Sequence, residues 1–321
     1  MNSVLKIGGA GLNRGERRTV DIALPRLYTH TEISMPVQVF RGKKDGPVLL
    51  ICAALHGDEL NGVEIIRRIS SVIDPSQLKG TIITVPVVNV FGFITQSRYL
   101  PDRRDLNRSF PGSQRGSLTA RLANTFMKEI VEKCDYGIDL HTASFNRINL
   151  PQIRADLSDP ETRNLSMAFG ARIIIHSDTR DGSLREAAVK RGIKMMVFEG
   201  GEALRFDPES IETGVRGILR IMSLLKMRKG KSRKLRKKTP VILSKTTWIR
   251  ARNSGILRLA VDLGEKISRR QILGAISDPL DEKPVHIRSP RNGIVIGKIN
   301  NPLVHRGDAM VHIGIQPEKP E

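Results

Sequence analysis

Residues 48–59 read Val48-Leu49-Leu50-Ile51-Cys52-Ala53-Ala54-Leu55-His56-Gly57-Asp58-Glu59. The apolar first part fits a buried parallel strand, and the segment from Leu60 to Ile69 fits the helix that follows it. His56 then lies in the strand-to-helix turn and Glu59 in the first helical turn. Ligands bind outside the carboxyl ends of the strands in open α/β sheets, so these two side chains are expected to converge at that edge.

A second histidine, His141, follows another short apolar run, Tyr136-Gly137-Ile138-Asp139-Leu140. It occupies an equivalent strand end and is expected at the same sheet edge. Two imidazoles and a carboxylate can fill three positions around a zinc ion and leave the fourth open for water. The sequence therefore makes His56, Glu59 and His141 candidate ligands of one zinc ion per chain, and the chain a candidate hydrolase. The alternative is that the strand-end histidines are hydrogen-bonded structural residues.

A loop rich in guanidinium groups, residues 97–112, lies between the two histidines. Arginine binds carboxylates through a planar two-pronged donor, so Asn107 and Arg108 can grip an acidic substrate while Arg98 faces a polarised carbonyl. Arg147 and Arg154, after His141, are further candidates for an anionic pocket. The alternative is an arginine-rich surface loop without a ligand.

A later apolar run, residues 193–198, ends in Glu199-Gly200-Gly201-Glu202. A carboxylate beside the proposed metal can act as general base, and the glycines allow the backbone to turn sharply next to it. Glu199 is the first candidate because it directly follows the apolar run. Glu202 is the second, and an exposed loop carboxylate is the alternative without a function.

Four ordered motifs carry a resemblance to a known family: His56-Gly57-Asp58-Glu59, Asp105-Leu106-Asn107-Arg108, Asp139-Leu140-His141 and Glu199-Gly200-Gly201. Together they resemble the succinylglutamate desuccinylase/aspartoacylase family, which is related to zinc carboxypeptidases, and the resemblance covers most of the chain. It implies that the first histidine, the glutamate and the second histidine bind zinc and that Glu199 is the general base. It also implies that Arg98 polarises the scissile carbonyl and that Asn107 and Arg108 hold the substrate carboxylate. The acyl group and the amine stay open.

The pattern of apolar runs along the chain predicts two domains. Residues 1–226 alternate apolar runs, ending near Leu55, Val88, Leu140, Ile175 and Phe198, with helical patterns such as the serine-capped segment 117–131. This half is expected to be an α/β catalytic domain with a mostly parallel sheet and flanking helices. The family resemblance implies that this sheet is zinc carboxypeptidase-like. A basic linker, residues 227–240, follows it.

Residues 241–321 change to short β-like runs broken by glycine and proline. Ser254-Gly255-Ile256 is echoed by Asn292-Gly293-Ile294, as in two similar β halves of one small domain. The pattern resembles the barrel-sandwich fold of biotinyl and lipoyl carriers but lacks their Met-Lys-Met hairpin, so Lys298 is interpreted as a surface lysine. We expect this domain to frame the catalytic cleft or to form a homo-oligomer contact.

Composition and charge narrow the function classes. The formal net charge of the 321 residues is +20, and residues 226–238 supply nine of the basic side chains. The electrostatic field of such a positive charge attracts anionic small molecules or nucleic acid. However, the chain is only 4% aromatic, and the basic run has no aromatic residue for base stacking. The run is interpreted as a solvated linker, and a nucleic-acid partner is disfavoured.

The two cysteines, Cys52 and Cys134, indicate no disulfide framework, and no apolar stretch is long enough to span a membrane or to form a signal peptide core. We expect a cytoplasmic enzyme with no membrane partner.

Three functions are compared. The first is zinc-dependent hydrolysis of the amide bond of an N-acylated amino acid, in which Glu199 takes a proton from the attacking water and passes it to the leaving amine. The second is a metallocarboxypeptidase that acts on peptides, and the third is a nonenzymatic nucleic-acid-binding protein.

The strand-end histidine His176 has either a structural or a substrate-facing role.

Overall fold

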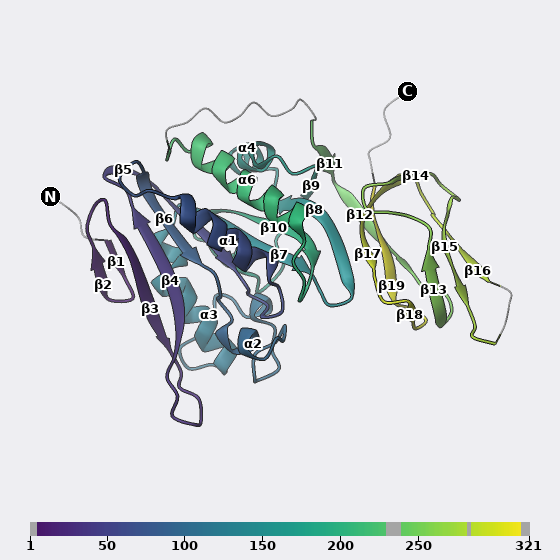
Figure 1. Cartoon of the computed structure of the whole chain (residues 1–321), viewed down its shortest axis with the longest axis horizontal. Helices are drawn as coiled ribbons and strands as arrows, with labels where there is room; N and C mark the ends of the chain where they lie inside the picture. Colours follow the sequence, from purple (N-terminus) through teal and green to yellow (C-terminus); the bar gives the residue numbers. More distant parts are fainter. Residues whose placement is uncertain (1–4, 229–238, 281–283, 316–321) are drawn as a thin grey trace.

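A computed structural model describes residues 5–228, 239–280 and 284–315. It has an α/β part, which extends from β1 to β11, and a smaller all-β part from β12 onward (Figure 1). Most of the predicted basic linker, residues 227–240, lies outside the described residues. Among the described residues, no helix is both long and apolar enough to cross a membrane.

Four parallel strands form the centre of the α/β part, in the order β10-β7-β5-β6. The apolar run that was expected to be a strand forms the second half of β5. Its alternate side chains enter two different cores: Leu50 and Cys52 face one side of the sheet, and Leu49, Ile51 and Ala53 face the other. A strand buried on both faces must be apolar throughout, which explains why this run shows no alternation. The four strands are β5 (Lys44–Ala53), β6 (Lys79–Val85), β7 (Tyr136–Ala143) and β10 (Lys194–Glu202).

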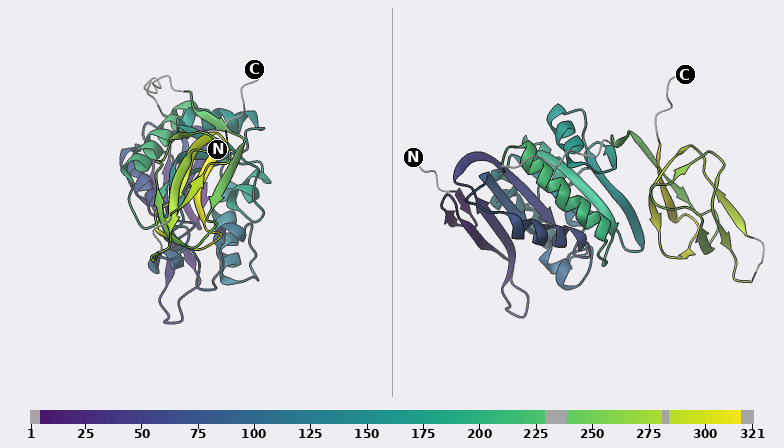
Figure 2. Two further views of the ribbon diagram at one scale, coloured as in Figure 1. Left: turned by 90° about the vertical axis from the view of Figure 1, so that its right-hand side faces the viewer. Right: turned by 45° about the horizontal axis from the view of Figure 1, so that its top comes forward.

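Helices cover both faces of this sheet, as the views in Figure 2 show. One core contains apolar residues of α2 (Val90–Ile94), α3 (Leu118–Glu129) and α5 (Leu184–Val189). The other contains those of α1 (Asn61–Val72), α4 (Pro160–Phe169) and α6 (Pro208–Leu224). The predicted serine cap of α3 is confirmed, because the Ser117 side chain accepts a hydrogen bond from the Ala120 amide. Two short 3-10 helices are η1 (Leu106–Arg108) and η2 (Val131–Lys133).

Antiparallel strands flank the parallel centre. On one side β3 (Arg17–Leu24) pairs with β4 (Ile33–Arg41), and β4 pairs with β6. A separate hairpin is formed by β1 (Leu5–Ile7) and β2 (Ala10–Leu12). On the other side β8 (Arg147–Ala155) runs antiparallel to β10, and β9 (Ile173–His176) and β11 (Val241–Leu243) extend the sheet further. The predicted α/β sheet with flanking helices is thus present, but it is mixed: β4 and β8 join the parallel centre in antiparallel fashion, and β8, β9 and β11 run parallel to one another.

The all-β part consists of two packed sheets around a small apolar core. One sheet has the order β16-β15-β13-β18, and the other contains β12, β19, β17 and the short β14. The two echoed sequence motifs begin β13 and β17, one strand in each sheet. The strands are β12 (Lys245–Arg250), β13 (Gly255–Leu259), β14 (Lys266–Ile267), β15 (Ile272–Ser277), β16 (Val285–Arg288), β17 (Gly293–Ile299), β18 (Leu303–Val304) and β19 (Ala309–Ile315).

The two parts share one sheet. β17 pairs antiparallel with the first residues of β8, so that Gly297 lies opposite Asn149 and Ile299 opposite Arg147. The hydrogen-bonded order therefore continues from β12 through β19, β17 and β8 into β10 and β7. This junction brings side chains of the all-β part beside the carboxyl ends of β7 and β10.

Candidate metal centre and active-site pocket

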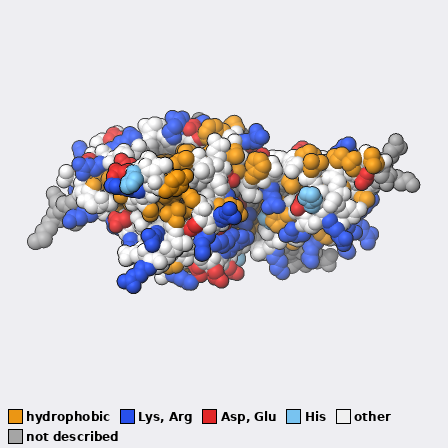
Figure 3. All heavy atoms as spheres, turned by 90° about the horizontal axis from the view of Figure 1, so that it is seen from below, with side chains coloured by type: hydrophobic (Ala, Val, Ile, Leu, Met, Phe, Trp, Pro, Cys, Tyr) orange, Lys and Arg blue, Asp and Glu red, His pale blue; other side chains and the backbone are white. Residues whose placement is uncertain are grey.

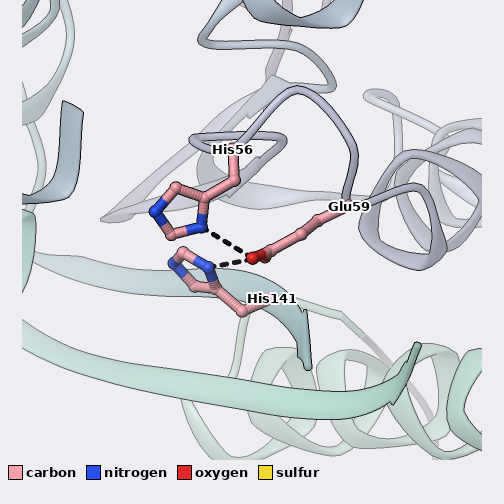
Figure 4. A group of neighbouring side chains, drawn as sticks. All are labelled: His56, Glu59 and His141. Atoms are coloured by element: carbon pink, nitrogen blue, oxygen red, sulfur yellow. Dashed lines mark hydrogen bonds and ion pairs between the residues drawn. The ribbon is translucent and has the colours of Figure 1, made fainter. Parts of the chain in front are cut away.

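The three predicted metal ligands meet at the carboxyl edge of β5 and β7 (Figure 4). Their ligand atoms all lie within 4.8 Å of one another, and all three side chains are buried. The prediction that Glu59 lies in the first helical turn is wrong: α1 begins at Asn61. The Glu59 amide instead donates to the His56 carbonyl, which closes a turn ahead of the helix and directs the Glu59 side chain back toward His56.

Glu59 lies between the two imidazoles. Its Oε1 is 2.7 Å from His56 Nδ1, its Oε2 is 2.7 Å from His141 Nδ1, and the Thr142 amide donates to Oε2 at 3.0 Å. Burial alone would raise the pKa of Glu59, but the two histidines outweigh it and lower that pKa far below its ordinary value. The carboxylate is therefore held ionised and faces the inner nitrogen of each ring.

An aspartate holds the outer nitrogen of each ring. His56 Nε2 lies 3.1 Å from Asp105 Oδ1, and His141 Nε2 lies 2.7 Å from Asp139 Oδ2. Burial lowers the pKa of both histidines, but the surrounding carboxylates outweigh it and raise both values. A carboxylate on the outer nitrogen fixes the tautomer that leaves the inner nitrogen for a metal, so this arrangement suits a pair of histidines that could hold a metal ion.

Arg98 links the ligand set to the arginine-rich loop. Its guanidinium donates to Glu59 Oε1 at 3.3 Å and to Asp105 Oδ2 at 3.0 Å. Burial opposes its charge, but these carboxylates raise the pKa of Arg98 above its ordinary value. The fixed positive charge thus stands directly beside the proposed metal ligands.

The close approach of α1 to the strand ends requires a glycine. A Cβ on Gly62 would lie 2.7 Å from the Cβ of Ala53 and 2.8 Å from that of Leu140. Since real side chains do not approach so closely, a larger residue would push the helix away from β5 and β7. Gly62 therefore allows the turn that carries Glu59 to rest between the two histidine-bearing strands.

The three candidate metal ligands and Arg98 line a pocket of about 590 Å³ at the junction of the two parts of the molecule. Basic side chains gather on the surface near this junction (Figure 3). Six arginines line the pocket against four carboxylates, so its field favours an anionic ligand. The arginines are Arg98, Arg108, Arg147, Arg154, Arg180 and Arg185.

Glu199 and Glu202 have different surroundings. Glu199 lies opposite His141 in the pairing of β10 with β7 and lines the pocket. Glu202 is buried, accepts a hydrogen bond from Asn300 at 2.7 Å and is not among the pocket residues. The geometry thus brings Glu199 into the pocket that contains the candidate metal ligands, while Glu202 contacts the all-β part.

Asn107 and Arg108 both line the pocket from η1. The Asn107 side-chain oxygen accepts a hydrogen bond from the Leu184 amide at 2.9 Å, and Arg108 is exposed at the rim with one nitrogen on the Asn107 carbonyl. Asp105 fixes this short helix, because its Oδ1 accepts from the Asn107 amide. The same aspartate therefore serves both His56 and the predicted carboxylate clamp.

Arg185 is a pocket residue that no sequence pattern indicated. It is 8% exposed, its Nη2 donates to Ser177 Oγ at 3.1 Å, and its Nη1 has no hydrogen-bond partner among the described residues. A buried guanidinium with an unpaired nitrogen is costly unless a ligand completes it. Its sequence context, a serine-capped helical segment, gave no indication of a binding role.

The all-β part contributes Thr246, Trp248 and His312 to the pocket, and the sequence analysis missed these as well. Arg147, at the start of β8, lies with its guanidinium carbon 5.4 Å from the Trp248 ring centroid. No sequence pattern predicts this contact, because Trp248 and His312 are brought to the pocket by the pairing of β17 with β8.

His176 does not line this pocket among the described residues. Its Nδ1 accepts a hydrogen bond from the Leu157 amide at 3.0 Å. Of the two roles left open for this histidine, the contact favours the structural one.

Comparisons with known proteins agree with this geometry. Residues 45–225 match the model of the succinylglutamate desuccinylase/aspartoacylase catalytic domain. The chain is 28% identical over 294 residues to the N-alpha-acetyl-L-2,4-diaminobutyric acid deacetylase of Halomonas elongata, an alignment that covers 88% of this chain and 85% of that protein.

Solved structures share the fold. A succinylglutamate desuccinylase/aspartoacylase from Rhodobacter sphaeroides superposes with a TM-score of 0.86 at 23% identity, covering 95% of this chain and 98% of that one. The product-bound ectoine utilization protein of Ruegeria pomeroyi superposes with a TM-score of 0.85 at 23% identity, covering 95% and 97% of the two chains. With the family model matching more than half of its residues, the chain belongs to the succinylglutamate desuccinylase/aspartoacylase family.

Proposed function

We propose that the protein is a zinc-dependent amidohydrolase that cleaves an N-acylated amino acid into a carboxylic acid and a free amino acid. The observation that carries this proposal is the meeting of His56, Glu59 and His141 in one arginine-lined pocket with Glu199. Membership of a deacylase family supports the same reaction type.

The donor set suits zinc. Two imidazole nitrogens and one carboxylate are a common protein ligand set for catalytic zinc, and the buried outer nitrogens of both rings are already bonded to aspartates. A bound zinc ion would supply Lewis acidity for the amide carbonyl and lower the pKa of a water in its open position. Asp105 and Asp139 would then keep the two rings oriented for it.

The arginine-rich loop orients the substrate. Arg98, held between Glu59 and Asp105, is placed to donate to the scissile carbonyl oxygen. Arg108 and the side-chain amide nitrogen of Asn107 bind the substrate carboxylate. The side-chain oxygen of Asn107 is already occupied, because it accepts a hydrogen bond from the Leu184 backbone amide. These contacts hold the amide bond between Arg98 and Glu199.

Glu199 moves the proton. It takes one from the attacking water as the new carbon–oxygen bond forms, and it returns that proton to the amine nitrogen as the carbon–nitrogen bond breaks. The products are the carboxylic acid and the amino acid, so no further reactant is needed.

The substrate class follows from the charge of the pocket. The Halomonas relative acts on a substrate with a second amino group, by its name. In this chain Arg154, Arg180 and Arg185 line the pocket, and the unpaired Nη1 of Arg185 favours an acceptor. We infer that the preferred substrate bears an acidic group beyond the carboxylate held by Arg108, in its acyl or amine portion.

A panel of zinc-loaded reactions tests the proposal. N-acetyl and N-succinyl derivatives of aspartate, glutamate, diaminobutyrate and alanine are compared with a series of peptides, and release of free amine is measured. Turnover of acidic N-acyl amino acids above the others is expected. Preferential cleavage of peptides would favour the carboxypeptidase alternative, and inactivity on every compound would reject the proposed reaction.

A further inference from the structure

The side chain of Glu199 accepts a single hydrogen bond from the described residues and also forms an ion pair with Arg154. Asn149 Nδ2 donates to Glu199 Oε2 at 2.9 Å. Arg154 Nε lies 3.1 Å from the same oxygen, an ion pair without hydrogen-bond geometry. Oε1 of Glu199 accepts no hydrogen bond from the described residues. Glu199 lines the pocket. One oxygen is thus anchored and the other is left for a proton.

Asn149 is well placed to fix this carboxylate. It is 7% exposed and lies on β8, between β10 and β17. Its backbone pairs with Gly201 on one side and with Gly297 on the other. A glutamate has several rotatable bonds, and a buried donor that selects one orientation removes the entropy cost of finding it during each turnover.

The space for Asn149 comes from the all-β part. A Cβ on Gly297 would lie 2.7 Å from Asn149 Oδ1 and 3.4 Å from the His312 Cβ. The first distance is shorter than real contacts allow, and the atom that must give way is the end of the Asn149 side chain. Any residue larger than glycine at position 297 therefore displaces the amide that holds Glu199.

We propose that Asn149 is a positioning residue for Glu199, and that Gly297 of the all-β part is required because it leaves Asn149 the room to act. The all-β part then shapes the reaction and does more than frame the pocket. The inference rests on the proposed function, since it takes Glu199 as the base.

The kinetic test compares Asn149→Ala, Asn149→Asp, Gly297→Ala and the double variant Asn149→Ala/Gly297→Ala in the full-length, zinc-loaded protein. Losing one positioning hydrogen bond should lower kcat by about tenfold, with KM within about twofold. Asn149→Asp keeps the shape but removes the donor, and should be at least as slow. Gly297→Ala should add nothing in the Asn149→Ala background, because its effect passes through Asn149.

Lys298→Ala is the matched control. Lys298 is the next residue of β17, and its Nζ bonds to Val261 and Asp262, away from Asn149. Its kcat should stay at the wild-type value. If the separate losses of Asn149→Ala and Gly297→Ala multiply in the double variant, or if Asn149→Asp keeps wild-type kcat, the positioning role is rejected.

Crystal structures of the wild type and Gly297→Ala give a readout that does not depend on activity. The distance from Asn149 Nδ2 to Glu199 Oε2 should lengthen beyond the hydrogen-bond limit of about 3.2 Å in the variant. An unchanged distance overturns the inference even if the wild type is active. A wild type inactive on the whole panel rejects the proposed reaction alone, and the crystal structures still decide whether Gly297 governs the contact.

Discussion

Trp248 and His312 stack face to face, with ring centroids 4.4 Å apart and planes inclined by 6°. They are direct cross-strand partners in the pairing of β12 with β19, and both line the pocket. Burial, with Arg154 and Arg180 nearby, lowers the pKa of His312 to about 3. The folded protein therefore keeps this imidazole neutral where an unfolded chain would charge it.

This difference predicts a loss of stability in acid. The unfolded chain takes up the proton near the ordinary value of 6.5, whereas the folded protein resists it until about pH 3. Between these values the unfolded state binds more protons, so the free energy of unfolding falls as the pH falls, by up to about 1.4 kcal/mol per pH unit. Above pH 6.5 His312 adds no pH dependence. His312→Phe should flatten the acid limb in urea titrations, whereas the exposed His305→Phe should leave it unchanged.

Replacing His56 by alanine should abolish stoichiometric zinc binding, because only two of three protein ligands then stay in place. Zinc content after dialysis, measured by atomic emission, checks this. His176→Ala is the control, since His176 is another strand-end histidine and its side chain contacts Asp156 and Leu157, which follow β8. Full zinc retention by His56→Ala would rule out this ligand set.

Asp139→Asn should weaken zinc binding by about 10–100-fold, the usual cost of losing a carboxylate behind a metal-bound histidine. The variant keeps the shape of the side chain but no longer places a negative charge on His141 Nε2. Competition with a chromophoric chelator measures the affinity. An unchanged dissociation constant would show that Asp139 does not orient the ring.

Glu199→Gln should keep its zinc and lose about a hundredfold or more in turnover, since an amide cannot accept the proton. Glu202→Gln should be much milder on turnover, because Glu202 contacts Asn300 and not the pocket. Stopped assays on zinc-matched samples compare the two. Near wild-type turnover by Glu199→Gln would require a different proton acceptor.

Arg108→Ala should raise KM for N-acyl amino acids more than for analogues whose α-carboxylate is an amide. Loss of a charged hydrogen bond predicts a difference of about 1.5–3 kcal/mol between the two substrates. Steady-state kinetics with both substrates measure it. Equal losses would remove Arg108 from the carboxylate site.

His56, His141 and Glu199 were predictable as pocket residues because each follows an apolar run of sequence, and the carboxyl ends of parallel strands meet at one edge of a sheet. In the structure His56 lies just beyond β5, whereas His141 and Glu199 lie within the last residues of β7 and β10, opposite each other. Glu59 shows its limit: the local turn with His56 holds the chain out of the helix, and propensity alone does not fix a helix start.

The rest of the pocket depends on contacts between distant segments. Trp248 and His312 enter it only because β17 pairs with β8, nearly 150 residues away in the chain, and no local pattern specifies that pairing. β3, β4 and β8 were likewise missed, since these strands lie outside the parallel centre and lack its continuous apolar runs. Arg185 was missed because its burial comes from tertiary packing.

The shared ladder of β8 and β17 also constrains motion. Separating the α/β part from the all-β part would break the backbone hydrogen bonds that residues 147–149 of β8 make with β17. Asn149, which bonds to Glu199, lies in this stretch. Opening between the two parts would therefore disturb the strand that carries Asn149. For the proposed reaction, we expect the substrate to enter and the products to leave through the existing mouth of the pocket, past exposed side chains such as Arg108.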